Sequence, residues 1–116
     1  MRERVPNPIS HLEFQVLLVL AEGASYGYAI MKGVEEQSGG RLCPDIGSLY
    51  RLLSRLSARG MVGEQKAPKD SDLNHRGSPR KYYGLTALGR KVVREEALHL
   101  AGLVATARTH QILPDG

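Results

Sequence analysis

The sequence predicts a mainly α-helical protein with one small β-hairpin, ordered as three helices, the hairpin and a last long helix. Apolar residues recur at helical spacing in four segments, which are bounded by capping residues, glycines and prolines. Two short segments of strand character, residues 61–66 and 80–85, flank a polar loop that contains glycine and proline. With 116 residues, of which 41% are hydrophobic, the chain is expected to fold as one domain.

The first helix has the clearest start. Ser10 and Glu13 have the spacing of a capping box, in which each side chain accepts a hydrogen bond from the backbone N–H of the other residue. Ile9 and Phe14 occupy the positions of a hydrophobic staple, and Gly23 is a natural stop. The residues between are apolar nearly all round, so we expect this helix at the centre of the core.

A second helix is expected from a cap at Ser25 to about Ser38, where Gly39-Gly40 ends it. Gly27 and Gly33 lie inside this helix, and each costs about 1 kcal/mol relative to alanine. We infer that they are there to permit close contact with another helix.

The third helix begins after Pro44, with Asp45 as its N-cap, and ends at Gly60. One of its faces is apolar and the other carries hydroxyl and guanidinium groups, so one is expected to pack and the other to present cations. The apolar face consists of Ile46, Leu49, Leu53 and Leu56, and the polar face of Ser48, Arg51, Arg55 and Arg59.

The two strands of the hairpin are joined by the polar loop 67–79. Because side chains alternate along a strand, Tyr83 and Leu85 are expected to point into the core and Tyr82 outward. The tyrosines are then structural, holding the base of the hairpin; the alternative is that Tyr82 stacks on a base, as aromatic rings do on single strands.

Thr86 caps the last helix, which Pro114 closes. Its apolar residues recur at alternating spacings of four and three, a seam of coiled-coil type. A helix that projects past a three-helix core has little partner surface in its own chain, so we expect a homodimer; packing within one chain is the alternative. The seam residues are Val93, Ala97, Leu100, Val104 and Ala107.

This order of elements is the layout of a winged helix-turn-helix with a C-terminal extension. In that fold the third helix enters the major groove and the hairpin, or wing, lies against the flanking DNA backbone. We expect a flexible N-terminal arm at residues 1–8, the winged helix-turn-helix at residues 9–85 and a dimerisation helix at residues 86–113.

Positive charge is concentrated in the middle of the chain. Residues 41–94 carry twelve basic and four acidic side chains, a net charge of +8, whereas the remainder carries −4. This asymmetry favours an anionic partner for the central segment, although a chance excess on a solvated surface would give the same sum.

Several classes of protein are not expected. The longest apolar run has six residues, too few to cross a membrane, and the N-terminus lacks the apolar region of a secretory signal. Cys43 is the single cysteine, which fits a reducing cytoplasm. We expect it to be a small buried hydrophobe, and the alternative is a redox handle beside the N-cap of the third helix. The four histidines have no metal-ligand or nucleophile–base spacing, and no nucleotide-binding or hydrolase motif is present, so we expect neither an enzyme nor a metal or cofactor site.

The third helix carries the residues most suited to DNA. Gly47 and Ser48 are small enough to approach a groove closely, while Arg51 and Arg55 can read guanine edges or clamp phosphates. Tyr50, between the apolar and cationic faces, allows either packing at the edge or a phosphate contact through its hydroxyl. From the hairpin, the residues placed for phosphate contacts are Lys69, Arg76, Arg80 and Lys81.

Three ordered stretches of the sequence resemble the PadR family of winged-helix transcriptional regulators. They are YGYAI at 26–30, PDIGSLYRLLSRLSARGMV at 44–62 and RKYYGLTALG at 80–89. The resemblance implies a homodimeric repressor of palindromic promoter DNA, with Gly47, Ser48, Tyr50 and Arg51 at or near the DNA. It also implies dimerisation through the last helix and the first, as in the short members. Some of those bind flat aromatic compounds against a tryptophan, which this chain lacks.

The sequence thus predicts a cytoplasmic, dimeric, sequence-specific repressor of a nearby operon that binds double-stranded DNA. Its relief by a small-molecule effector at the dimer interface is a subsidiary hypothesis. The alternative from another class is a winged-helix protein-interaction module that docks an acidic protein through its basic face.

Overall fold

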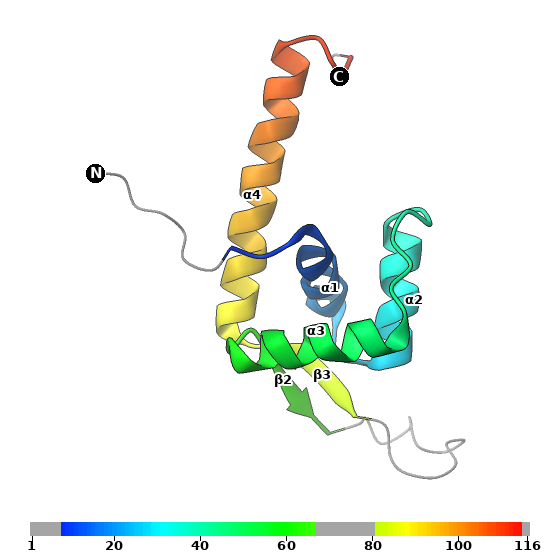
Figure 1. Ribbon diagram of the computed structural model, residues 1–116. Coiled ribbons are helices and arrows are strands. Elements are labelled where there is room, and N and C mark those ends of the chain that lie inside the picture. Colours follow the sequence, from blue (N-terminus) through cyan, green and yellow to red (C-terminus); the bar gives the residue numbers. More distant parts are fainter. Residues whose placement is uncertain (1–7, 67–80, 115–116) are drawn as a thin grey trace.

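The computed structural model describes residues 8–66 and 81–114. Figure 1 shows helices α1, α2 and α3 gathered into a body, with two strands leading away below α3 and the long helix α4 projecting beyond the body. This architecture confirms the predicted mainly α fold with a small sheet. The elements are α1 (His11–Glu22), β1 (Ser25–Tyr26), α2 (Gly27–Gln37), α3 (Ile46–Ala58), β2 (Val62–Gln65), β3 (Tyr82–Leu85) and α4 (Ala87–Thr109).

Helix α1 forms the centre of the core, as its apolar sequence predicts. The capping box is present: the Glu13 N–H donates to Ser10 Oγ at 3.1 Å, and the Ser10 N–H donates to Glu13 Oε1 at 2.8 Å. Val16 and Leu17 are fully buried. Phe14 is buried in the same cluster, against which Ile9 is partly buried.

Within the described residues the sheet has three strands, one more than the sequence predicted. The strand order is β1-β3-β2, and both pairings are antiparallel. The extra strand corrects the start of α2: Ser25 does not cap this helix, because it lies in β1 opposite Tyr83. Tyr26 is the residue at the N-cap position, and its side chain makes no capping hydrogen bond.

The extra strand also corrects the orientation of Tyr82. This residue was expected to face outward, but it is as deeply buried as Tyr83. The reason is that β1 places Tyr26 directly opposite Tyr82, and the two ring centroids are 5.4 Å apart. Tyr83 belongs to the core and Leu85 packs against it, as predicted. Both faces of β3 are therefore covered at the base of the hairpin.

The two glycines of α2 lie at close helix contacts, as predicted. A β-carbon at Gly33 would lie 3.0 Å from Cγ1 of Val19 in α1, a tighter approach than side chains normally make. A β-carbon at Gly27 would lie 2.7 Å from the hydroxyl oxygen of Tyr50 in α3. Helix α2 thus uses the two glycines to approach α1 and α3.

Two predicted burials around α3 are wrong. The buried stripe of this helix consists of Leu49, Leu52, Leu53 and Leu56. Ile46 was expected to extend it, but this residue stands in the first turn, beyond the core cluster, and is 40% exposed. Cys43, expected to be buried, is exposed in the segment that leads into α3, where its Sγ lies 3.6 Å from Glu35 Oε2.

Helix α4 begins as predicted and ends early. Thr86 caps it by accepting a hydrogen bond from the Gly89 N–H at 3.0 Å. The helix ends at Thr109, before Pro114, because Gln111 adopts a left-handed φ of 64° and the Ile112 N–H returns to the Ala107 carbonyl at 2.8 Å. The radius of gyration is 16.4 Å, above the about 13 Å of a compact domain near this size, which reflects the projection of α4.

Candidate nucleic-acid interface

The exposed side of α3 carries small residues around one arginine. Positions spaced by four, three and four residues share one side of a helix. On α3 the exposed positions with this spacing are Gly47, Arg51, Ser54 and Ala58, which we call the α3 stripe. Because three of its four members are small, the α3 stripe can approach another surface closely. Sequence reasoning did not include Ser54 and Ala58, although their spacing from Arg51 was the available signal.

The N-terminal turn of α3 fixes the Arg51 side chain. Arg51 Nη2 donates to Ser48 Oγ at 3.1 Å, and the guanidinium group reaches back beside Gly47. The Ser48 N–H donates in turn to the N-cap carboxylate Asp45 Oδ1 at 2.7 Å. This backbone hydrogen bond holds the pKa of Asp45 below its ordinary value, and the charge of Arg51 adds to the effect. The sequence-predicted residues Gly47, Ser48 and Arg51 are therefore brought together.

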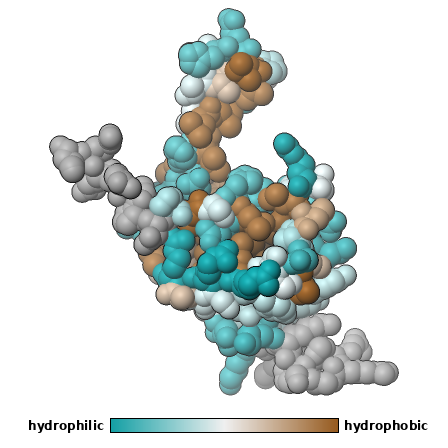
Figure 2. All heavy atoms as spheres, in the orientation of Figure 1, coloured by the Kyte–Doolittle hydropathy of each residue, from teal (hydrophilic) through white to brown (hydrophobic). Residues whose placement is uncertain are grey.

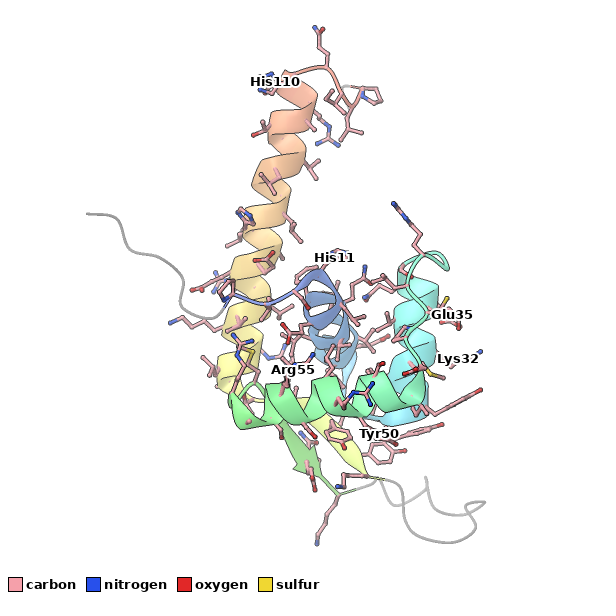
Figure 3. The ribbon with its side chains drawn as sticks, in the orientation of Figure 1. His11, Lys32, Glu35, Tyr50, Arg55 and His110 are labelled. Atoms are coloured by element: carbon pink, nitrogen blue, oxygen red, sulfur yellow. The ribbon has the colours of Figure 1, made fainter. Side chains whose placement is uncertain are left out.

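Tyr50 and Arg55 lie on opposite edges of the α3 stripe. In Figure 3, Tyr50 lies on the side of α3 toward the strands and Arg55 on the side toward α1. The Tyr50 ring packs against Gly27 and remains 44% exposed, so edge packing is present and the residue is still accessible.

Arg55 pairs with Glu13, a contact that was not predicted from the sequence. Its Nε lies 3.8 Å from Oε2 of Glu13 in α1, and the Arg55 side chain is 60% exposed. Arg59 Nη1 lies 3.8 Å from Oε1 of the same carboxylate and is more covered. From the sequence, Glu13 is expected to act in the capping box only, and no local pattern indicates that it also meets α3.

At the base of the hairpin, Lys81 is also paired. Its Nζ lies 3.3 Å from Oε2 of Glu64 on β2, both side chains are exposed, and the hydrogen bond raises the pKa of Lys81. Of the other predicted phosphate contacts, Lys69, Arg76 and Arg80 lie outside the described residues, as do the loop 67–79 and residues 1–7 of the predicted arm.

Residues 16–95 match the family model of the transcriptional regulator PadR-like family. The chain belongs to this family. The resemblance seen in the sequence motifs is confirmed, and so is the expectation that the chain is a regulator and not an enzyme. In residues 8–66 and 81–114, no three histidine, cysteine, aspartate or glutamate side chains form a group that could hold a metal ion.

Solved structures of other PadR-like proteins share this fold. A PadR family transcription regulator from Clostridium difficile is 19% identical, with a TM-score of 0.69 over 88% of this chain and 99% of that chain. A PadR-like transcription factor from Bacteroides fragilis is 28% identical, with a TM-score of 0.66 over 84% and 87%. Bacillus subtilis PadR in complex with operator DNA is 20% identical, with a TM-score of 0.63 over 76% and 47%.

A longer relative shares sequence with this PadR-like chain. An uncharacterised 37.1 kDa protein in transposon TN4556 of Streptomyces fradiae is 40% identical over 88 residues. The match covers 76% of this chain and 22% of the relative, so the chain spans about a fifth of that protein's length.

The predicted seam of this PadR-like regulator is buried at one end and open at the other. Val93 belongs to the protomer's own core, and Leu100 packs partly against that core. Farther along α4, Val104 is 40% exposed and the adjacent Leu103 is also exposed. Figure 2 shows apolar side chains along the projecting part of α4 and hydrophilic side chains over α3. Among the described residues, no helix combines the length and apolar character needed to cross a membrane.

Proposed function

We propose that this PadR-like chain is a cytoplasmic, homodimeric repressor that binds palindromic promoter DNA with α3 of each protomer in the major groove. The observation that carries the proposal is the α3 stripe, in which Arg51 stands among Gly47, Ser54 and Ala58. A major groove admits a helix of this kind, and arginine is the side chain that most often reads guanine. Bacillus subtilis PadR, whose fold this chain shares, was solved in complex with operator DNA, which supports double-stranded DNA as the partner.

The two edges of the α3 stripe and the start of the helix are assigned different tasks. Tyr50 and Arg55 contact phosphates beside the groove, and the small residues Gly47 and Ser48 let the start of α3 approach the bases. The wing supplies further phosphate contacts through Lys69, Arg76, Arg80 and Lys81. Phosphate contacts fix the register of the helix, whereas base contacts determine which sequence is bound.

Two protomers are joined through their last helices. On the projecting part of α4, Leu103 remains 52% exposed and Val104 40% exposed. A second copy of α4 is the natural cover, because a two-fold interface uses the same surface from both chains. Residues 9–85 would then bind DNA while residues 86–113 join the protomers, with half-sites roughly 34–36 Å apart, one helical turn of DNA.

Selection of bound duplexes from a random pool tests this function. The expected result is enrichment of one palindrome whose half-sites are about one helical turn apart. The same palindrome should then be found upstream of neighbouring genes. Enrichment of no sequence, with only weak and salt-sensitive binding to any duplex, would instead indicate the protein-interaction module that docks an acidic partner.

Relief by a small molecule at the dimer interface is part of the same proposal. A ligand that binds the folded dimer raises its unfolding temperature by mass action. A thermal-shift screen of metabolites should therefore reveal a stabiliser that also weakens operator binding. A screen in which no stabiliser affects operator affinity would remove the effector from the proposal.

A further inference from the structure

Glu13 of α1 is a buried carboxylate that faces two arginines of α3. Only 7% of the residue is exposed. Its Oε2 lies 3.8 Å from Arg55 Nε, and its Oε1 lies 3.8 Å from Arg59 Nη1. The same Oε1 accepts the Ser10 N–H at 2.8 Å, which anchors the carboxylate to the start of α1. A fixed negative charge therefore stands beneath the edge of the proposed DNA-binding helix.

The attraction between Glu13 and the arginines is mainly electrostatic. Both N···O distances exceed the length of a hydrogen bond, so neither guanidinium group is held by direct donation to the carboxylate. Glu13 is covered while the Arg55 side chain is 60% exposed, so salt screens this pair less than it screens a pair of two exposed charges. Arg55 and Arg59 are one turn apart and repel each other, and the carboxylate offsets that repulsion.

We propose that Glu13 is a positioning residue that limits how strongly Arg55 binds phosphate, and thereby restrains binding to unrelated DNA. The inference depends on the proposed DNA-binding function. A phosphate that approaches Arg55 must compete with the charge of Glu13. Among the described residues, Arg51 has no acid at ion-pair distance, and the acid that acts on it from farther away, Asp45, is exposed. Because phosphate contacts do not discriminate between sequences, weakening them favours the contacts that do.

The substitution Glu13→Gln in the full chain tests this role. Glutamine keeps the size of the side chain, and its amide oxygen can still accept the Ser10 N–H in the capping box. Fluorescence anisotropy would measure affinity for the selected palindrome and for an unrelated duplex across a salt series. We expect tighter binding to the unrelated duplex, a several-fold lower ratio of specific to unrelated affinity, and a log–log salt slope steeper by about 0.9 for each added phosphate contact.

Two matched variants separate this role from a general change in charge. Glu36→Gln removes the same charge from an exposed position on α2 that has no ion pair in the described part of the chain, so the affinity ratio should stay near that of the unaltered protein. In an Arg55→Ala background, Glu13→Gln should lose most of its effect, because the side chain through which it acts is absent. If Glu13→Gln does not fold, Arg55→Ala alone gives the test: it should reduce operator affinity less than Arg51→Ala.

The possible outcomes distinguish the inference from the proposed function. A folded Glu13→Gln variant with unchanged salt slope and affinity ratio, in a protein that binds its palindrome, overturns the role of Glu13 and leaves DNA binding intact. If Arg55→Ala loses as much operator affinity as Arg51→Ala, or more, the role of Glu13 is likewise overturned and DNA binding is left intact. Failure of the unaltered protein to bind any duplex specifically overturns the proposed function itself.

Discussion

The hydroxyl end of Tyr50 on α3 fills the space where a side chain at Gly27 of α2 would begin. A β-carbon at position 27 would lie 2.7 Å from Tyr50 Oη and 2.8 Å from Cζ. The contact joins the start of α2 to the edge of the α3 stripe. The absence of a side chain at Gly27 therefore determines where the Tyr50 ring lies beside the proposed DNA surface.

Gly27→Ala should couple energetically to Tyr50. Alanine favours a helix by up to about 1 kcal/mol over glycine, but here the added carbon displaces the ring, which is exposed enough to swing outward. We expect Gly27→Ala to be neutral or destabilising in the unaltered chain and stabilising in a Tyr50→Ala background. Urea unfolding of the unaltered protein, the two single variants and the double variant, all at the same protein concentration, should give a coupling free energy of about 0.5 kcal/mol or more. Additive effects would show that the ring does not depend on Gly27.

Gly89→Ala should destabilise the fold strongly. A β-carbon at Gly89 would collide with the backbone carbonyl oxygen of Met61, which cannot move without disturbing β2. Such overpacking costs about 1–3 kcal/mol.

Gly102→Ala is the matched control for Gly89→Ala, since the same substitution in the same helix meets nothing within 4 Å. It should stabilise α4 by up to about 1 kcal/mol. Chemical denaturation of both variants measures the contrast, and equal effects at the two glycines would contradict the packing described for Met61.

Asp45 should contribute a stabilisation that disappears in acid. The Ser48 N–H bonds to the ionised carboxylate and lowers its pKa below the ordinary 3.8. A group with a lowered pKa in the folded state stabilises the protein above its unfolded pKa, and this contribution is lost as pH falls through the folded pKa. In Asp45→Asn the amide still caps α3 but does not ionise, so its stability should fall less than that of the unaltered protein below about pH 4. Thermal melts of the two proteins at several pH values between 5 and 2 test this. An equal fall of the melting temperature in both proteins would contradict it.

The elements that the sequence predicts well are those set by local chemistry. The caps at Ser10, Asp45 and Thr86 and the close approach at Gly33 follow from patterns within one or two turns of the chain. The hydrogen bonds and contacts that such patterns predict form within or close to one helix, so they do not depend on how distant segments pair.

The errors come from contacts between distant segments. The pairing of β1 with β3 moved the start of α2 and buried Tyr82, and a two-residue strand is too short to show alternation. Likewise, the capping box already explains why a glutamate stands at position 13, so the sequence gives no sign that Glu13 also pairs with Arg55. The α3 stripe was partly predictable, because Arg51 and Gly47 share a helical spacing that the sequence displays.

Val104→Arg should separate the proposed dimer without unfolding the protomer. Val104 lies on the seam side of α4, beyond the part that packs on the body. A charge placed in an apolar interface without a partner should weaken association by about 2 kcal/mol or more, roughly 30-fold.

The matched control is Leu98→Arg, because Leu98 is exposed and lies on the other side of the helix. Sedimentation at micromolar concentration should give a monomer for Val104→Arg and a dimer for Leu98→Arg. If both variants are dimers, the dimer interface does not include the seam around Val104.

The most direct test of the central claim, that α3 reads DNA sequence, is the effect of Arg51→Ala on discrimination. The measurement compares affinity for the selected palindrome with affinity for a duplex changed at one guanine in each half-site. Arg41→Ala removes the same charge from a cleft shared with His11 and Gln15 and serves as the control. We expect Arg51→Ala to lose about 1–3 kcal/mol of discrimination at its guanine, roughly 5- to 150-fold, and Arg41→Ala to lose none. Undiminished discrimination in Arg51→Ala would contradict the claim.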